Sequence, residues 1–191
     1  MRSRLLTEEG GRKVFAVVFD KGDEVTEGLT RFAERQRLGA SQVSAIGALS
    51  GATLGYFDRD AKDYLKIPIR EQVEVLSLLG DIVDSGGKPT LHAHLVVGRR
   101  DGTTLGGHLL EAHVWPTLEV IVTETPAHLQ KRHDPETGLA LISLPEASPE
   151  FDPGVPPRDV ESDEVAEASW ESFPASDAPG WRDHEPHRGQ R

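Results

Sequence analysis

The apolar positions between residues 12 and 144 follow two different periods along the chain. Near the start they repeat with the spacing of one helical face, after Asp23, a residue type that caps helix N-termini. The residues on this face are Val25, Leu29, Phe32 and Ala33. The pattern predicts one helix, which begins after Asp23 and ends at Leu38 and Gly39.

The remaining apolar residues form short runs, or alternate with polar residues, between turns rich in glycine, proline and charged residues. Such runs predict about eight short β-strands. Among them are residues 13–19, 41–50, the hairpin 53–58 and 64–70, then 90–97, 105–114 and 117–123. One helix and this many strands predict an α+β fold, in which a mostly antiparallel sheet packs on one main helix.

The composition changes after residue 146. Residues 147–191 hold seven of the 13 prolines and 11 acidic against four basic residues. They carry −7 of the net charge of −11, which leaves −4 for residues 1–146. Few aliphatic residues and no sustained period predict a largely disordered acidic tail, although residues 159–170 have a loosely amphipathic pattern. The chain is therefore divided into an arm (1–11), a domain (12–146) and a tail (147–191).

The predicted tail contains three aromatic residues, a residue type that is uncommon in disordered segments. They are Trp170, Phe173 and Trp181. Two interpretations stay open: these side chains dock on the domain or stay exposed, or they form a short motif that binds a partner protein.

Composition excludes several classes of protein. The absence of cysteine excludes disulfides, thiolate zinc sites and a cysteine nucleophile. The longest apolar runs, such as Val14–Phe19, are too short to span a membrane, and the N-terminus has no signal-peptide core. We therefore expect a soluble cytoplasmic protein without membrane partners. No dinucleotide-binding loop, P-loop or nucleophile elbow is present either.

Histidines are the main chemical signal in the sequence. His92 and His94 are two residues apart, which in a strand places both side chains on one face, about 7 Å apart. His108 begins the next predicted strand, and a hairpin would bring it close to them. Three imidazoles favour a divalent metal, most of all Zn²⁺, with a fourth position open. The alternative is that these are half-buried histidines with ordinary hydrogen bonds. Glu119 is the candidate catalytic base of a metal site, unless it belongs to a buried polar network.

Four linked segments resemble a known domain family. They are SAIGALSGATLGY (Ser44–Tyr56), EVLSLLGDI (Glu74–Ile82), PTLHAHLVVG (Pro89–Gly98) and GGHLLEAHVWPTLEV (Gly106–Val120). In this order they resemble the PPC domain ("plants and prokaryotes conserved"), also called domain of unknown function 296. The likeness extends roughly from Gly11 to Leu144.

This resemblance implies a compact α+β domain that forms a homotrimer. In plant relatives the domain follows an AT-hook that binds AT-rich DNA, and the domain itself serves trimerisation and the recruitment of partner proteins. Some prokaryotic relatives carry a metal ion at the histidines that match His92, His94 and His108. This chain has no R-G-R-P core of an AT-hook, and its negative charge repels duplex DNA. The sequence therefore argues against direct nucleic-acid binding.

Three hypotheses follow from the sequence. The preferred one is a trimeric assembly or regulatory module with a divalent metal, associated with DNA only through partner proteins. A second is a metal-dependent hydrolase, lyase or small-ligand binder that uses the three histidines, with Glu119 as base and a zinc-bound water as nucleophile. The third is direct DNA binding, which rests on family association alone.

Overall fold

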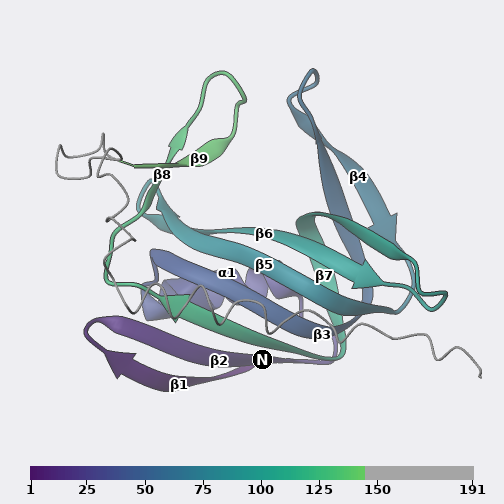
Figure 1. Ribbon diagram of the computed structural model, residues 1–191, viewed down its shortest axis with the longest axis horizontal. Coiled ribbons are helices and arrows are strands. Elements are labelled where there is room, and N and C mark those ends of the chain that lie inside the picture. Colours follow the sequence, from purple (N-terminus) through teal and green to yellow (C-terminus); the bar gives the residue numbers. More distant parts are fainter. Residues whose placement is uncertain (145–191) are drawn as a thin grey trace, which may run out of the picture. The chain divides into compact units, whose positions relative to one another are not determined.

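The structure is a computed structural model that describes residues 1–144. This part of the chain forms nine strands and one helix (Figure 1). In chain order they are β1 (Arg2–Glu9), β2 (Arg12–Asp20), α1 (Val25–Gln36), β3 (Ala40–Asp58), β4 (Asp63–Ile69), β5 (Val73–Ser85), β6 (Lys88–Gly98), β7 (Thr104–Glu124), β8 (Gln130–His133) and β9 (Ala140–Ser143). The helix is not long and apolar enough to cross a membrane.

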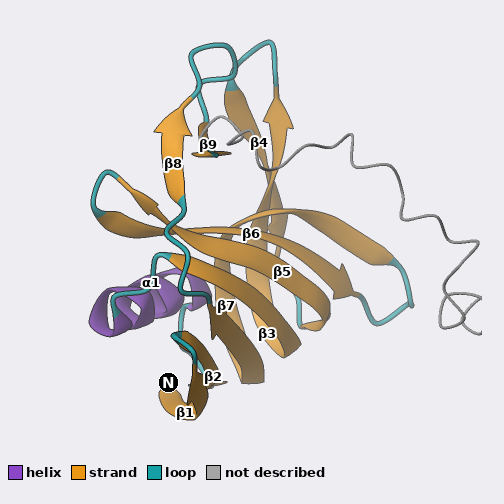
Figure 2. Cartoon of the chain, turned by 60° about the vertical axis from the view of Figure 1, so that its left-hand side comes forward, coloured by secondary structure: helices purple, strands orange, loops and turns teal. Residues whose placement is uncertain are grey.

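Nearly all strand pairs are antiparallel, and the strands join in one sheet. Strand β6 pairs with both β5 and β7, and β3 also pairs with both, so these four strands close into a ring. Strands β1 and β2 extend the sheet from β7. Two hairpins, β3–β4 and β8–β9, project from the same side of the ring (Figures 1 and 2).

The helix begins one residue later than the sequence predicts. The N-cap is Glu24, whose Oε2 accepts a hydrogen bond from the backbone amide of Glu27 at 2.6 Å. Asp23, the predicted cap, instead accepts a hydrogen bond from the backbone amide of Asp20 and lies 2.7 Å from the N-terminal amine. Its carboxylate therefore ties the chain terminus to β2 and leaves the helix cap to its neighbour.

The predicted fold class is wrong, because the domain is mostly β. An α+β fold packed on one main helix needs a helix that covers much of the sheet, but α1 has 12 residues and contacts mainly β6 and β7. By contrast, β3 has 19 residues and β7 has 21. The prediction ends strands at Ser50 and Val114, whereas the chain stays extended past both, with local shifts in register.

Glycine makes one of these long strands possible. Gly47 has a φ of +150°, and a Cβ added there would overlap the backbone of Thr117. Strands β3 and β7 thus approach each other more closely than any side chain permits. Only glycine fits at this point of close approach.

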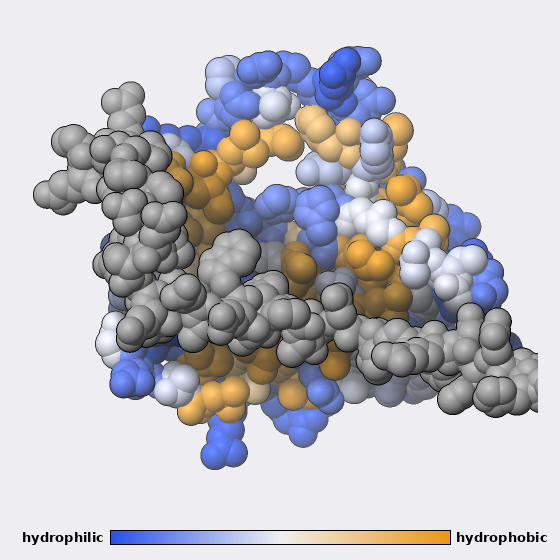
Figure 3. All heavy atoms as spheres, in the orientation of Figure 1, coloured by the Kyte–Doolittle hydropathy of each residue, from blue (hydrophilic) through white to orange (hydrophobic). Residues whose placement is uncertain are grey.

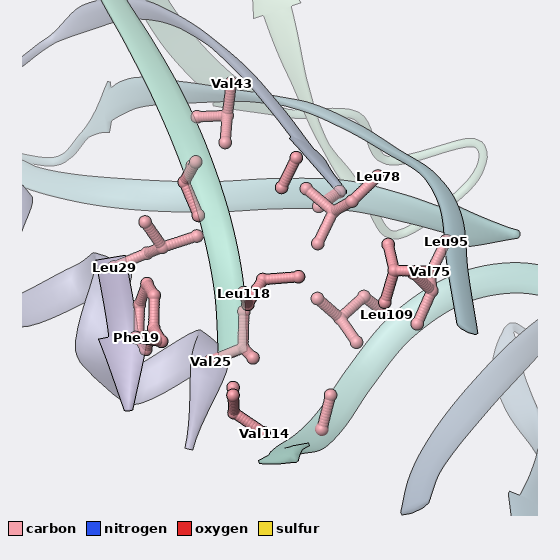
Figure 4. Close-up of a cluster of buried hydrophobic side chains, with 14 of the residues drawn as sticks. Phe19, Val25, Leu29, Val43, Val75, Leu78, Leu95, Leu109, Val114 and Leu118 are labelled. Atoms are coloured by element: carbon pink, nitrogen blue, oxygen red, sulfur yellow. The ribbon is translucent and has the colours of Figure 1, made fainter. Parts of the chain in front are cut away.

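The core lies inside the ring of strands and under the helix (Figure 4). Val25 and Leu29 from α1 meet Leu118 and other strand side chains, and all three are fully buried. Burying a side chain of this kind contributes about 1.5–3 kcal/mol. The predicted helical face is therefore the face that packs on the sheet.

The outer face of the ring, opposite the core, is unusually apolar for a surface. Five large aliphatic side chains there are 41–62 % exposed: Ile46, Leu76, Leu79, Val96 and Ile121. Figure 3 shows exposed apolar residues, drawn as orange spheres, between hydrophilic regions on one side of the molecule. We call this set of five residues the outer apolar patch.

The predicted acidic tail and the predicted division of the chain are not tested by the structure. The acidic tail, with its amphipathic segment 159–170 and its three aromatic residues, lies outside the described residues. The division into arm, domain and tail also stays a prediction, although Arg2–Glu9 forms β1 and pairs with β2 along most of its length.

Candidate metal centre

The histidines lie on the outer face of the ring because of the alternation along β6. Ala93 and Leu95 point into the core and are buried, so His92 and His94, which alternate with them, point outward. Strand β7 pairs with β6 such that His108 lies directly opposite His94. The predicted hairpin thus brings all three imidazoles to one face.

The three imidazoles are close enough to share one cation. Each offers a ring nitrogen, and these nitrogens all lie within 4.8 Å of one another. The ring centroids are 5.2–5.4 Å apart, and the rings of His92 and His94 meet edge to face. Zn²⁺ with bonds of about 2.0–2.1 Å to three nitrogens would fit with small adjustments of the side chains.

The protonation of His108 also suits a metal ligand. Burial, together with the neighbouring His92 and His94, lowers the pKa of His108 to about 4, so the ring is neutral at pH 7. Its Nδ1 is buried and has no hydrogen-bond partner among residues 1–144. An unsatisfied buried nitrogen costs free energy, and a bound cation at the cluster would offset that cost. The residues present therefore fit a divalent metal.

Side chains from other strands contact the histidine cluster on two sides. The Tyr64 ring from β4 stacks on His108 with 4.6 Å between centroids. On the other side, Nδ1 of His92 lies 3.4 Å from Oδ2 of Asp81 on β5. Lys131 from β8 lies 2.7 Å from the other oxygen of Asp81, and its side chain is only 3 % exposed. Both projecting hairpins thus contribute a side chain around the cluster.

Burial and Asp81 act on His92 in opposite directions. Burial lowers the pKa of His92 and has the larger effect, while the carboxylate of Asp81 raises it. The net shift is downward, so this imidazole too is mainly neutral at pH 7 and able to bind a cation.

Glu119 does not lie with the histidines. It is not among the residues whose ligand atoms lie within 4.8 Å of one another. It pairs with Ile46 on β3, and together with four of the five residues of the outer apolar patch it lines a depression of about 290 Å³. The buried polar network offered as its alternative role does not hold either, because Glu119 is exposed. A catalytic role for Glu119 stays a prediction without support from the geometry of the cluster.

The sequence reading missed Asp81, Lys131 and Tyr64. Asp81 could have been found, because the tight turn at Gly86 and Gly87 fixes the register of the hairpin and sets Asp81 opposite His92. No comparable local signal exists for Lys131 or Tyr64. Both come from hairpins whose position depends on tertiary packing.

Comparison with known proteins identifies the domain. Residues 6–126 match the sequence model of the Plants and Prokaryotes Conserved (PCC) domain, for which PPC is the other abbreviation. This confirms the resemblance that four sequence segments predict.

Two solved structures are similar in fold. A metal-containing protein from Archaeoglobus fulgidus has a TM-score of 0.65 and 34 % identity, and the match covers 69 % of this chain and 94 % of that one. A candidate DNA-binding protein from Bacteroides thetaiotaomicron has a TM-score of 0.66 and 26 % identity, with 74 % and 96 % covered.

A curated relative is much longer than this chain. The bifunctional protein GlmU of Synechococcus sp. is 34 % identical over an alignment of 146 residues, which covers 73 % of this chain. The match spans only 22 % of that protein's length.

Proposed function

This chain belongs to the Plants and Prokaryotes Conserved domain family, and from that premise we propose that it is a homotrimeric module that holds one Zn²⁺ per subunit. The ligands would be His92, His94 and His108. The observation that carries this proposal is the convergence of three imidazole nitrogens within 4.8 Å in a chain without cysteine. Imidazole is a ligand that zinc favours, and a similar structure is that of a metal-containing protein.

Assembly is supported by the outer apolar patch. Contiguous exposed apolar residues on a domain of this size are typical of an interaction surface. Leu79 of the patch lies directly opposite His94 across β5 and β6, so the patch adjoins the cluster. The number of subunits comes from the family resemblance, which implies a trimer.

Metal analysis of tag-free protein tests the metal part of the proposal. We expect about one zinc per chain in the wild type, and loss of metal uptake in His94→Ala. The matched control is His133→Ala, because His133 is an exposed histidine on β8 outside the cluster. Wild-type protein that takes up no stoichiometric metal from a zinc solution would refute this assignment.

The open fourth position supports a second candidate function, the binding of a small ligand or substrate. Three protein ligands leave a tetrahedral zinc with one free position, and the exposure of His94 lets solvent reach it. The cation would supply Lewis acidity there. Titration of Co²⁺-loaded protein with azide tests access to that position, because an added ligand changes the visible spectrum. An unchanged spectrum would count against an open site.

Association with DNA is proposed only through partner proteins. Residues 1–146 carry a net charge of −4, and binding to duplex DNA relies on clustered basic residues. Fluorescence anisotropy with duplex DNA at about 100 mM salt should therefore show no binding at micromolar protein. Salt-dependent binding under these conditions would favour the direct DNA-binding hypothesis instead.

A further inference from the structure

The contacts of Asp81 reach beyond the three histidines. Asp81 lies opposite His92 in the register of β5 and β6, and its side chain is 27 % exposed. Its two carboxylate oxygens have different neighbours. Lys131 lies 2.7 Å from Oδ1, and His92 Nδ1 lies 3.4 Å from Oδ2.

Lys131 restricts the orientation of the carboxylate. Its ammonium group comes from β8, which joins β5 through a single parallel pair at Asp84 and Gln130. The side chain of Lys131 is nearly fully buried, and a buried ammonium keeps its charge only beside an opposite charge. Because Lys131 occupies the Oδ1 side, Oδ2 is the oxygen that faces His92.

The position of Oδ2 determines which ring nitrogen His92 can offer. A neutral imidazole carries one proton, and a carboxylate beside Nδ1 favours the tautomer with that proton on Nδ1. Nε2 is then the nitrogen with a free lone pair. The separation of 3.4 Å is at the long end of hydrogen-bond distances, and such contacts often tighten when the ligand binds.

We propose that Asp81 is a positioning residue of the metal centre: it accepts a hydrogen bond from Nδ1 of His92 and thereby presents Nε2 to the cation. This inference rests on the proposed metal function. Carboxylates behind metal-binding histidines commonly fix the tautomer, orient the ring and raise its basicity. Asp81 does not contact the cation itself and acts on it only through His92.

The test measures zinc affinity of full-length, tag-free protein by competition with a chromophoric chelator. Asp81→Asn should bind zinc about 10–100-fold more weakly than the wild type. Asp84→Asn is the matched control, because it removes the same charge from the same strand, where Asp84 caps the turn by accepting from Gly87. Its affinity should stay within about threefold of the wild type.

A second measurement needs no variant, in case Asp81→Asn leaves Lys131 unpaired and fails to fold. Nitrogen NMR of zinc-loaded wild-type protein should show His92 protonated at Nδ1 and metal-bound at Nε2. Metal at Nδ1, or a crystal structure with Asp81 bonded directly to zinc at about 2.0–2.2 Å, would overturn the proposal.

The two proposals fail in distinguishable ways. Wild-type protein that binds no zinc removes the metal function and this inference together. Wild-type protein that binds zinc while Asp81→Asn and Asp84→Asn bind equally well removes the role of Asp81 and leaves the metal function intact.

Discussion

At the residue scale, the half-buried imidazole of His108 couples the histidine cluster to the stability of the fold. The pKa of His108 is about 4 in the folded protein because burial and the two other histidines disfavour its charged form, against 6.5 for an ordinary histidine. Between these values the unfolded chain binds more protons than the folded one. Folding stability therefore falls as the pH decreases from about 6.5 to about 4.

The first prediction follows from this decrease in folding stability at low pH. In metal-free protein, His108→Gln should flatten the decrease in unfolding free energy over this pH range by about 1–2 kcal/mol, a figure reduced for the partial exposure of the ring. Urea unfolding at several pH values in the presence of a chelator measures it. The exposed His133→Gln variant serves as the control. A His108→Gln profile as steep as that of the wild type would contradict the prediction.

The candidate site was predictable from the sequence as far as spacing alone can go. The alternation of His92 and His94 around Ala93 places two imidazoles on one face, and the following hairpin adds His108. The spacing of the sequence does not support the prediction that Glu119 is a catalytic base, because distance along a strand says little about which residues converge. The carboxylate that lies beside the cluster is Asp81, which the turn at Gly86 and Gly87 sets opposite His92.

At the element scale, the sequence predicts best those elements that bury one face. The helical face and most of β2 and β6 bury alternate or periodic residues, and their predicted positions agree with the structure within a few residues. Strand β1 escaped prediction because all eight of its residues are exposed, so no apolar pattern marks it. Strand β8 has four residues, which is too short for a detectable period.

The second prediction concerns the packing of α1 on the sheet at Gly28. Alanine normally stabilises a helix by about 0.5–1 kcal/mol relative to glycine. A Cβ at Gly28, however, would overlap the ring of Phe19, which is fully buried. Because overpacking costs about 1–3 kcal/mol, we expect Gly28→Ala to lower the free energy of unfolding by about 1–2 kcal/mol.

Urea unfolding followed by circular dichroism measures this change. Glu34→Ala on the exposed side of the same helix is the control and should change stability by less than about 0.5 kcal/mol. A Gly28→Ala variant more stable than the wild type would show that Phe19 moves aside easily and that helix and sheet are loosely packed.

At the scale of the whole molecule, the proposed assembly surface and the proposed metal site lie on the same face but consist of different residues. The three histidines come from one chain, so a single subunit has all the protein ligands of the proposed site. The outer apolar patch lies beside them, and its large side chains stay exposed in an isolated chain. A variant that breaks assembly should therefore leave metal uptake intact.

Ile46→Lys makes this separation testable. Ile46 is 62 % exposed and pairs across strands with Glu119, which gives the new lysine an ion-pair partner in the monomer. At a subunit interface the substitution would lose about 1.5–3 kcal/mol of apolar burial per subunit and bury a charge.

Light scattering should give three times the chain mass for the wild type and the chain mass for the variant at micromolar concentration. Gln36→Lys on α1 makes the same charge change on an exposed helical position and should remain trimeric. A wild-type monomer would refute the trimer, whereas a monomeric variant that loses its zinc would show that the metal site needs a neighbouring subunit.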